Sequence, residues 1–239
     1  TNGTPVTIGE GGGTLQTQGN FTMQAAFDGG GVLTKTGAGE LAMATGGNVL
    51  DHVVLKEGTL RATADNVNFG DTLVFAGNST YADHDDWYSY STNSNSFKVE
   101  EGVDAYMYLD GRCTYTGRLY GKGTLRVNVP YVRSYLQGNW SAFEGTLVTL
   151  NSGQTFSFDN GYGLPKAVLN IPEGVYVGNS GKAFEIGKVT GAGSLGGLCL
   201  DYKSGVNTWK IGSLNEDFTF SAVITGTGTM FEKVGTGKM

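Results

Sequence analysis

GGGVLTKTGAGELAMATGGNVLDHVVLKEGTL, residues 29–60, is the segment that decides the fold. It contains three short apolar runs, Val32-Leu33, Leu41-Ala42-Met43 and Val53-Val54-Leu55, separated by glycine-rich stretches. Because glycine adopts positive φ without a steric cost, it suits a chain that must turn sharply. The segment therefore predicts short strands that alternate with tight turns.

The rest of the chain has the same character. Of its 239 residues, 40 are glycine, 39% are hydrophobic and 16% are charged. Glycine is about twice as frequent as in an average globular protein and charge is scarcer, while the apolar content is sufficient for a core. We find no segment with the apolar periodicity and end caps of a helix, whereas short alternating stretches recur. This pattern predicts an all-β protein.

Glycine-containing units recur along the sequence at nearly constant spacing. The tripeptide Gly-Thr-Leu begins at Gly13, Gly58, Gly123 and Gly145, and the last two copies are 22 residues apart. A repeat of about 20 residues is typical of a solenoid, in which one coil cannot bury its apolar face alone. We therefore predict a single-stranded parallel β-helix (β-solenoid) that forms one domain over residues 1–239.

A longer unit is repeated near the C-terminus. Residues 33–41, LTKTGAGEL, match residues 231–239, FEKVGTGKM. Two explanations stay open: the chain is part of a longer array of such units, which we favour, or Met239 lies in a final edge strand.

These units resemble the autotransporter-associated β-strand repeat. The resemblance rests on residues 33–41, on Gly46-Gly47-Asn48 and on residues 54–60, VLKEGTL. Residues 48–52, NVLDH, depart from the family pattern at the turn after the second strand. The resemblance implies a right-handed parallel β-helix in the passenger of a bacterial surface protein, outside the cell, and it transfers no catalytic residues.

The net charge and the hydropathy of the chain bear on whether it binds nucleic acid or crosses a membrane. The net charge is −6 and there is no Lys/Arg cluster, which argues against nucleic-acid binding. No apolar run approaches 18 residues, so we expect no membrane span. Cys113 and Cys199 lie about four coils apart, too far for a disulfide, so we expect two buried thiols.

One segment, residues 81–96 (YADHDDWYSYSTNSNS), lacks the repeat pattern and predicts an irregular loop. Its carboxylates Asp83, Asp85 and Asp86 are candidate ligands for a divalent cation, with Ca²⁺ favoured by oxygen donors. Paired carboxylates also act as acid and base in glycoside hydrolysis. The simpler interpretation, which we favour, is a solvated acidic loop.

Aromatic residues in and after this loop form the second candidate site. Exposed Tyr and Trp rings have a flat apolar face and a polar edge, which suits a carbohydrate or a protein partner. The alternative is a ladder of aromatic rings stacked from coil to coil. The predicted ligand-binding residues are Trp87, Tyr88, Tyr90, Tyr106, Tyr108 and Trp140.

Three functions are compatible with these features. We expect a non-enzymatic extracellular module of a bacterial surface protein, a stalk or adhesin, that needs no cofactor. The expected partners are neighbouring repeats of the same polypeptide and a host or environmental glycan or protein. The alternatives are a glycan-binding module that uses the aromatic residues, and a polysaccharide hydrolase or lyase.

Overall fold

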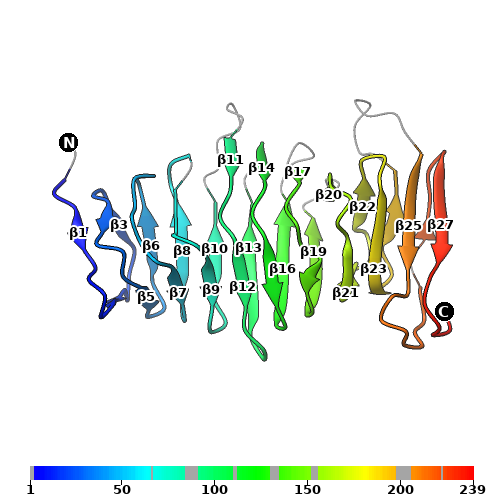
Figure 1. Ribbon diagram of the computed structural model, residues 1–239, viewed down its shortest axis with the longest axis horizontal. Coiled ribbons are helices and arrows are strands. Elements are labelled where there is room, and N and C mark those ends of the chain that lie inside the picture. Colours follow the sequence, from blue (N-terminus) through cyan, green and yellow to red (C-terminus); the bar gives the residue numbers. More distant parts are fainter. Residues whose placement is uncertain are drawn as a thin grey trace.

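The computed structural model describes residues 3–65, 67–83, 91–109, 112–129, 135–151, 156–197, 206–221 and 223–239. These residues form strands and no helix, and every strand pair is parallel. The strands stack side by side along one long axis, with the N-terminus at one end and the C-terminus at the other (Figure 1). The predicted all-β solenoid fold is therefore confirmed.

Three parallel sheets form the walls, and we number these faces in the order in which the chain visits them. In the described part of the chain, face 1 consists of β2 (Gly13–Gln16), β5 (Leu33–Thr36), β7 (Val53–Leu55), β9 (Leu73–Phe75), β12 (Phe97–Val99), β15 (Leu119–Gly121) and β18 (Ala142–Phe143). Face 2 consists of β3 (Phe21–Met23), β6 (Glu40–Met43), β8 (Thr59–Ala62), β10 (Thr80–Ala82), β13 (Asp104–Tyr108), β16 (Thr124–Val129), β19 (Thr146–Asn151), β21 (Leu164–Asn170), β23 (Ala183–Thr190), β25 (Asn207–Ile211) and β27 (Thr229–Lys233). Face 3 consists of β11 (Ser91–Asn93), β14 (Cys113–Tyr115), β17 (Tyr135–Leu136), β20 (Phe156–Phe158), β22 (Tyr176–Asn179), β24 (Ser194–Gly196) and β26 (Val223–Ile224). A separate pair joins β1 (Val6–Thr7) to β4 (Phe27–Asp28).

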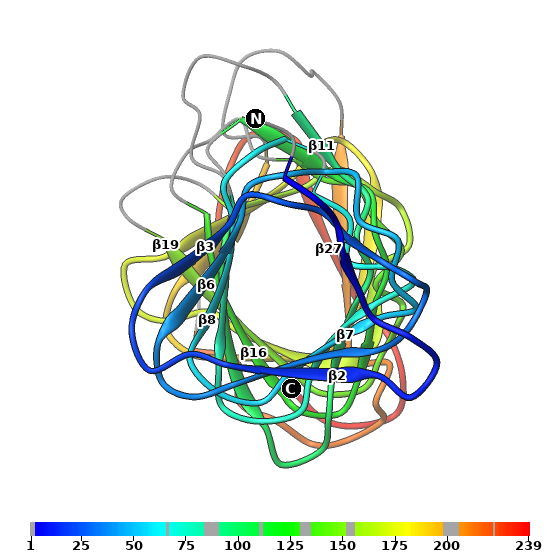
Figure 2. The same cartoon turned by 90° about the vertical axis from the view of Figure 1, so that its left-hand side faces the viewer.

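The register confirms a coil of about 20 residues. On face 1, Leu33 pairs with Val53 and Val53 pairs with Leu73. Viewed from the N-terminal end, the chain runs clockwise as it recedes from the viewer (Figure 2), so the solenoid is right-handed. Each coil therefore places its residues directly beside those of the coils before and after it.

Side chains that point inward form a continuous core. Strand patterns alternate between buried and part-exposed positions, as in β16 and β13. Aromatic rings meet within this core: Phe158 and Phe184 stack with centroids 4.3 Å apart, and Phe184 and Trp209 meet edge to face at 5.6 Å. These three rings lie after the aromatic residues for which the sequence predicted a ladder.

In residues 29–60, the turn that follows β5 surrounds the ammonium group of a buried lysine. Lys35 is fully buried on the inner side of β5, and its ammonium donates hydrogen bonds to the carbonyls of Gly37 (2.6 Å), Thr36 (3.1 Å) and Glu57 (2.9 Å). Burial lowers the pKa of Lys35, and the negative charge of Glu57 partly opposes this shift. The lysine therefore joins its own turn to the next coil.

The C-terminal copy of the unit repeats two of these lysine contacts. Lys233 donates to the carbonyls of Val234 (2.6 Å) and Gly235 (3.2 Å), the positions that correspond to Thr36 and Gly37. The lysine contacts of the two copies therefore correspond, but Lys35 is buried on face 1 whereas Lys233 is half-buried on face 2.

The predicted loop over residues 81–96 is wrong at both ends. Tyr81 belongs to β10 and points into the core, where it is fully buried, and β11 covers Ser91–Asn93. We predicted strands from alternating apolar residues, and polar residues such as Asn93 interrupt that alternation here. Residues 84–90 lie outside the described residues.

Candidate functional site

The structure separates the predicted ligand-binding aromatics into three groups. Tyr106 and Tyr108 are half-buried on the outer side of β13. Trp140 is only 3% exposed, and its indole Nε1 donates to the carbonyl of Gly117 at 3.2 Å, so the prediction of an exposed ring there is wrong. Trp87, Tyr88 and Tyr90 lie outside the described residues.

Tyr106 and Tyr108 line a cleft on face 2. The register places Tyr106 beside Thr80, and Ala82 between Arg61 and Tyr108. Because alanine is small, a hollow of about 380 Å³ remains between the larger side chains of neighbouring coils. Its lining is Thr59, Arg61, Thr80, Ala82, Tyr106 and Tyr108.

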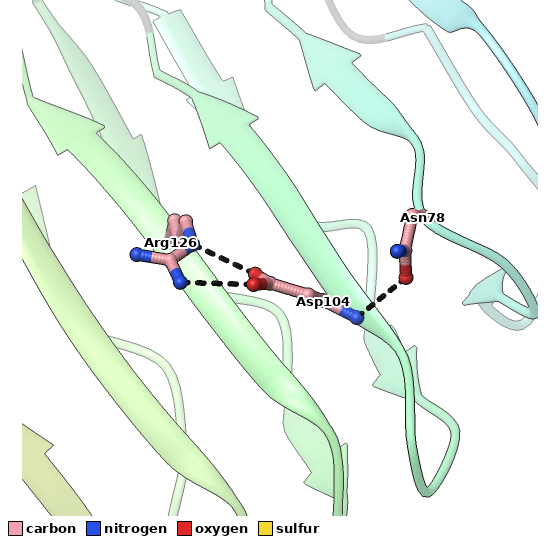
Figure 3. Close-up of polar contacts among 3 residues, drawn as sticks. All are labelled: Asn78, Asp104 and Arg126. Atoms are coloured by element: carbon pink, nitrogen blue, oxygen red, sulfur yellow. Dashed lines mark hydrogen bonds and ion pairs between the residues drawn. The ribbon is translucent and has the colours of Figure 1, made fainter.

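Polar contacts between coils surround the cleft. Tyr106 accepts a hydrogen bond from Asn128 at 3.0 Å, and Arg61 Nε donates to Glu40 at 2.9 Å. Also on face 2, Arg126 of β16 donates to both carboxylate oxygens of Asp104 of β13 at 2.8 Å (Figure 3). These hydrogen bonds raise the pKa of Arg126. The cleft thus has fixed walls, two phenol rings and one guanidinium.

Asp83, a predicted metal ligand, lies inside the solenoid with 6% exposure. Its carboxylate accepts hydrogen bonds from Tyr115 (2.5 Å), Tyr81 (2.9 Å) and Asn93 (3.1 Å). Burial raises the pKa of both tyrosines well above the usual value, and the charge of Asp83 adds to the shift. The favoured interpretation of Asp83 as part of a solvated loop is therefore wrong.

This arrangement bears on both chemical hypotheses for the acidic segment. A carboxylate that accepts three buried donors is a structural group and is not exposed to a substrate. Asp85 and Asp86 lie outside the described residues, so the metal site stays a prediction. Among the residues that the structure describes, no group of three His, Cys, Asp or Glu side chains could hold a metal ion.

Further hollows among the described residues were not predicted from the sequence, and two of them contain a tyrosine. One, of about 620 Å³, lies where face 3 turns into face 1, beside Tyr120. The other, of about 690 Å³, lies next to Tyr162, which is 56% exposed. The sequence signal available for the first was the pair Leu119-Tyr120, because successive residues of a strand point to opposite faces.

The remaining expectations concern the thiols and the membrane. Cys113 is buried, as predicted, and its thiol contacts the carbonyl of Thr114 at 3.7 Å. Cys199 lies outside the described residues. Across the described ranges there is no helix of the length and hydropathy that a membrane crossing requires.

Comparison of this chain with protein-family models, with curated proteins and with solved structures gives no match. Functional inference therefore rests on the fold and on these surfaces.

Proposed function

We propose that this chain is a non-enzymatic, extracellular β-helix module of a bacterial surface protein that serves as a stalk or adhesin. The observation that supports the proposal is the repeated lysine turn. Lys35 and Lys233 hold equivalent carbonyls in two units that resemble the autotransporter-associated β-strand repeat. Such a unit adds length to a rod without requiring any chemistry.

Neighbouring repeats of the same polypeptide are the first proposed partner. Strand β27 lies at the edge of face 2, and Phe231, which pairs with the buried Trp209, is 39% exposed. An edge strand with an exposed inward-facing ring is suited to pairing with another coil.

Surface labelling of intact cells tests the placement. Antibodies raised against the chain should label intact cells of the bacterium that encodes it, and external protease should remove the signal. A cytoplasmic marker serves as the control for cell integrity. Labelling that requires permeabilised cells would contradict the extracellular proposal.

Glycan binding is the second candidate, and the face 2 cleft favours it. Tyr106 and Tyr108 offer two rings, and Arg61 offers a hydrogen-bond donor. The protein should bind specific glycans on an array, and Tyr108→Ala should weaken this binding, whereas Tyr162→Ala should not. If no glycan on a broad array binds, the stalk function is favoured.

A polysaccharide hydrolase or lyase is the third candidate. The engagement of Asp83 by three donors removes one of the carboxylates on which this hypothesis relied. Release of reducing ends or of unsaturated products from a panel of polysaccharides would revive it.

A further inference from the structure

We propose that the groove beside Tyr120, where face 3 turns into face 1, is a binding site for a neutral oligosaccharide. The groove of about 620 Å³ has the size of a typical ligand site. Its lining residues come from successive coils: Asp71, Thr72, Ser96, Arg118, Leu119, Tyr120, Asn139 and Ala142. It lies on a different face from the Tyr106–Tyr108 cleft, and the proposal does not depend on the function proposed above.

Tyr120 is anchored as a flat platform. Its hydroxyl lies 2.6 Å from Oγ1 of Thr72, which precedes β9, two coils away from β15. Since neighbouring strands are about 4.8 Å apart, the side chain must extend along the solenoid axis to cover about 10 Å. The ring is therefore held along the wall, with one face available to the groove.

On the side of β15 away from Thr72, the residue in register with Tyr120 is small. Tyr120 pairs in register with Ala142, which is exposed. Ala142 and Asn139 line the groove on this side. An aromatic face with open space next to it suits the apolar face of a sugar ring.

The polar lining selects hydroxyl groups over charged groups. Asp71 is an acceptor, Arg118 is a donor, and neither forms an ion pair among the described residues. Asn139 and Ser96 can both donate and accept. One acid and one base give a neutral lining, and the chain has a net charge of −6, which opposes an anionic ligand.

The length of the groove indicates more than one sugar unit. The lining extends from Asp71 in the coil of β9 to Ala142 in the coil of β18, three coils further along the axis. Three steps of about 4.8 Å give about 14 Å. An extended oligosaccharide that runs parallel to the axis fits this shape.

Isothermal titration calorimetry with defined hexasaccharides tests the proposal. The probes are cellohexaose, maltohexaose, mannohexaose and xylohexaose as neutral ligands, and hexagalacturonate as the acidic comparison. We expect at least one neutral hexasaccharide to bind and hexagalacturonate to bind more weakly. No neutral binding at millimolar concentration, or tighter binding of hexagalacturonate, would overturn the proposal.

Matched variants assign the binding to this groove. Tyr120→Ala should weaken binding about tenfold, as expected for loss of an aromatic stacking partner, and Tyr120→Phe should retain most of it. Arg118→Ala should also weaken binding, whereas Tyr162→Ala, which lies outside both clefts, should not. Circular dichroism checks that each variant is folded. Binding that survives Tyr120→Ala in a folded variant, or that Tyr162→Ala abolishes, would refute the assignment.

Discussion

A single carboxylate, Asp83, joins side chains from two neighbouring coils. Tyr81 and Asn93 belong to its own coil, and Tyr115 comes from β14 in the next one. In the printed sequence the same residue is the first of the acidic run Asp83-His84-Asp85-Asp86 and resembles a surface group. Asp83 is buried because it directly follows β10 and accepts a hydrogen bond from Tyr115, which is 32 residues away. A local sequence pattern does not show a contact over that separation.

Asp83→Asn should destabilise the protein strongly. The amide replaces one acceptor oxygen by a donor, so at least one of the buried donors of Tyr81, Asn93 and Tyr115 loses its acceptor. We therefore expect a loss of about 2–4 kcal/mol in the free energy of unfolding. Asp104→Asn removes the exposed pair with Arg126 and should cost at most about 1 kcal/mol. Urea unfolding measures both, and equal losses in the two variants would contradict the structural role of Asp83.

Alkaline pH should destabilise the same cluster. The pKa values of Tyr81 and Tyr115 are raised above 10.0 in the folded protein, so above that pH the unfolded state holds fewer protons than the native state. The stabilisation is complete below pH 10.0 and is lost as the pH rises above it. Urea unfolding on both sides of pH 10.0 should show this decline.

Phenylalanine variants provide the control for the pH dependence. Tyr81→Phe and Tyr115→Phe each remove one ionisable hydroxyl, so the decline above pH 10.0 should be shallower in both. An unchanged slope would mean that other groups cause the alkaline instability.

At the scale of the element, the turns determine how closely the coils approach one another. Gly58 has a φ of 69°, and a Cβ there would lie 2.4 Å from the carbonyl oxygen of Gly39 and 2.8 Å from Nζ of Lys35. The sequence predicted these turns correctly because glycine spacing is a local signal. It did not predict the strand at Ser91–Asn93, since that strand has few apolar residues.

Alanine substitutions at Gly30 and Gly58 distinguish two contributions to the free energy of unfolding: the strain of a positive φ and the steric contact of a new Cβ. Gly30 has a φ of 68° with no atom within 4 Å of an added Cβ, so Gly30→Ala should cost about 1–2 kcal/mol. Gly58→Ala, at nearly the same φ, should cost at least about 2 kcal/mol more because the Cβ meets the preceding coil. Thermal and urea unfolding compare them, and equal costs would show that the coils relax apart.

At the scale of the whole molecule, each coil contacts chiefly its neighbours. Residues that pair between strands lie about 20 residues apart in sequence, as Leu41 and Leu60 do. Stability in such an array is a sum of coil and interface terms, so the ends can open without the centre.

Hydrogen exchange should therefore be graded along the axis. Strand β1 is exposed at both residues, whereas β16 alternates between buried and half-buried positions within the sheet. We expect amides of β1 and β2 to exchange first and those of β13, β16 and β19 to exchange last. Exchange measured by mass spectrometry on peptides checks this, and uniform protection would indicate a single cooperative unit.

The sequence by itself determined the class of fold, the length of the coil and the glycine turns, because glycine spacing and period-2 alternation act over a few residues. Only the tertiary structure decided which outward residues form a surface. Tyr120 and Thr72 are 48 residues apart, and their contact depends on the lengths of two complete coils. The coils differ in length, so a fixed sequence period does not give the residues that lie side by side two or more coils apart. The clefts of faces 1 and 2 therefore form only when the coils are stacked.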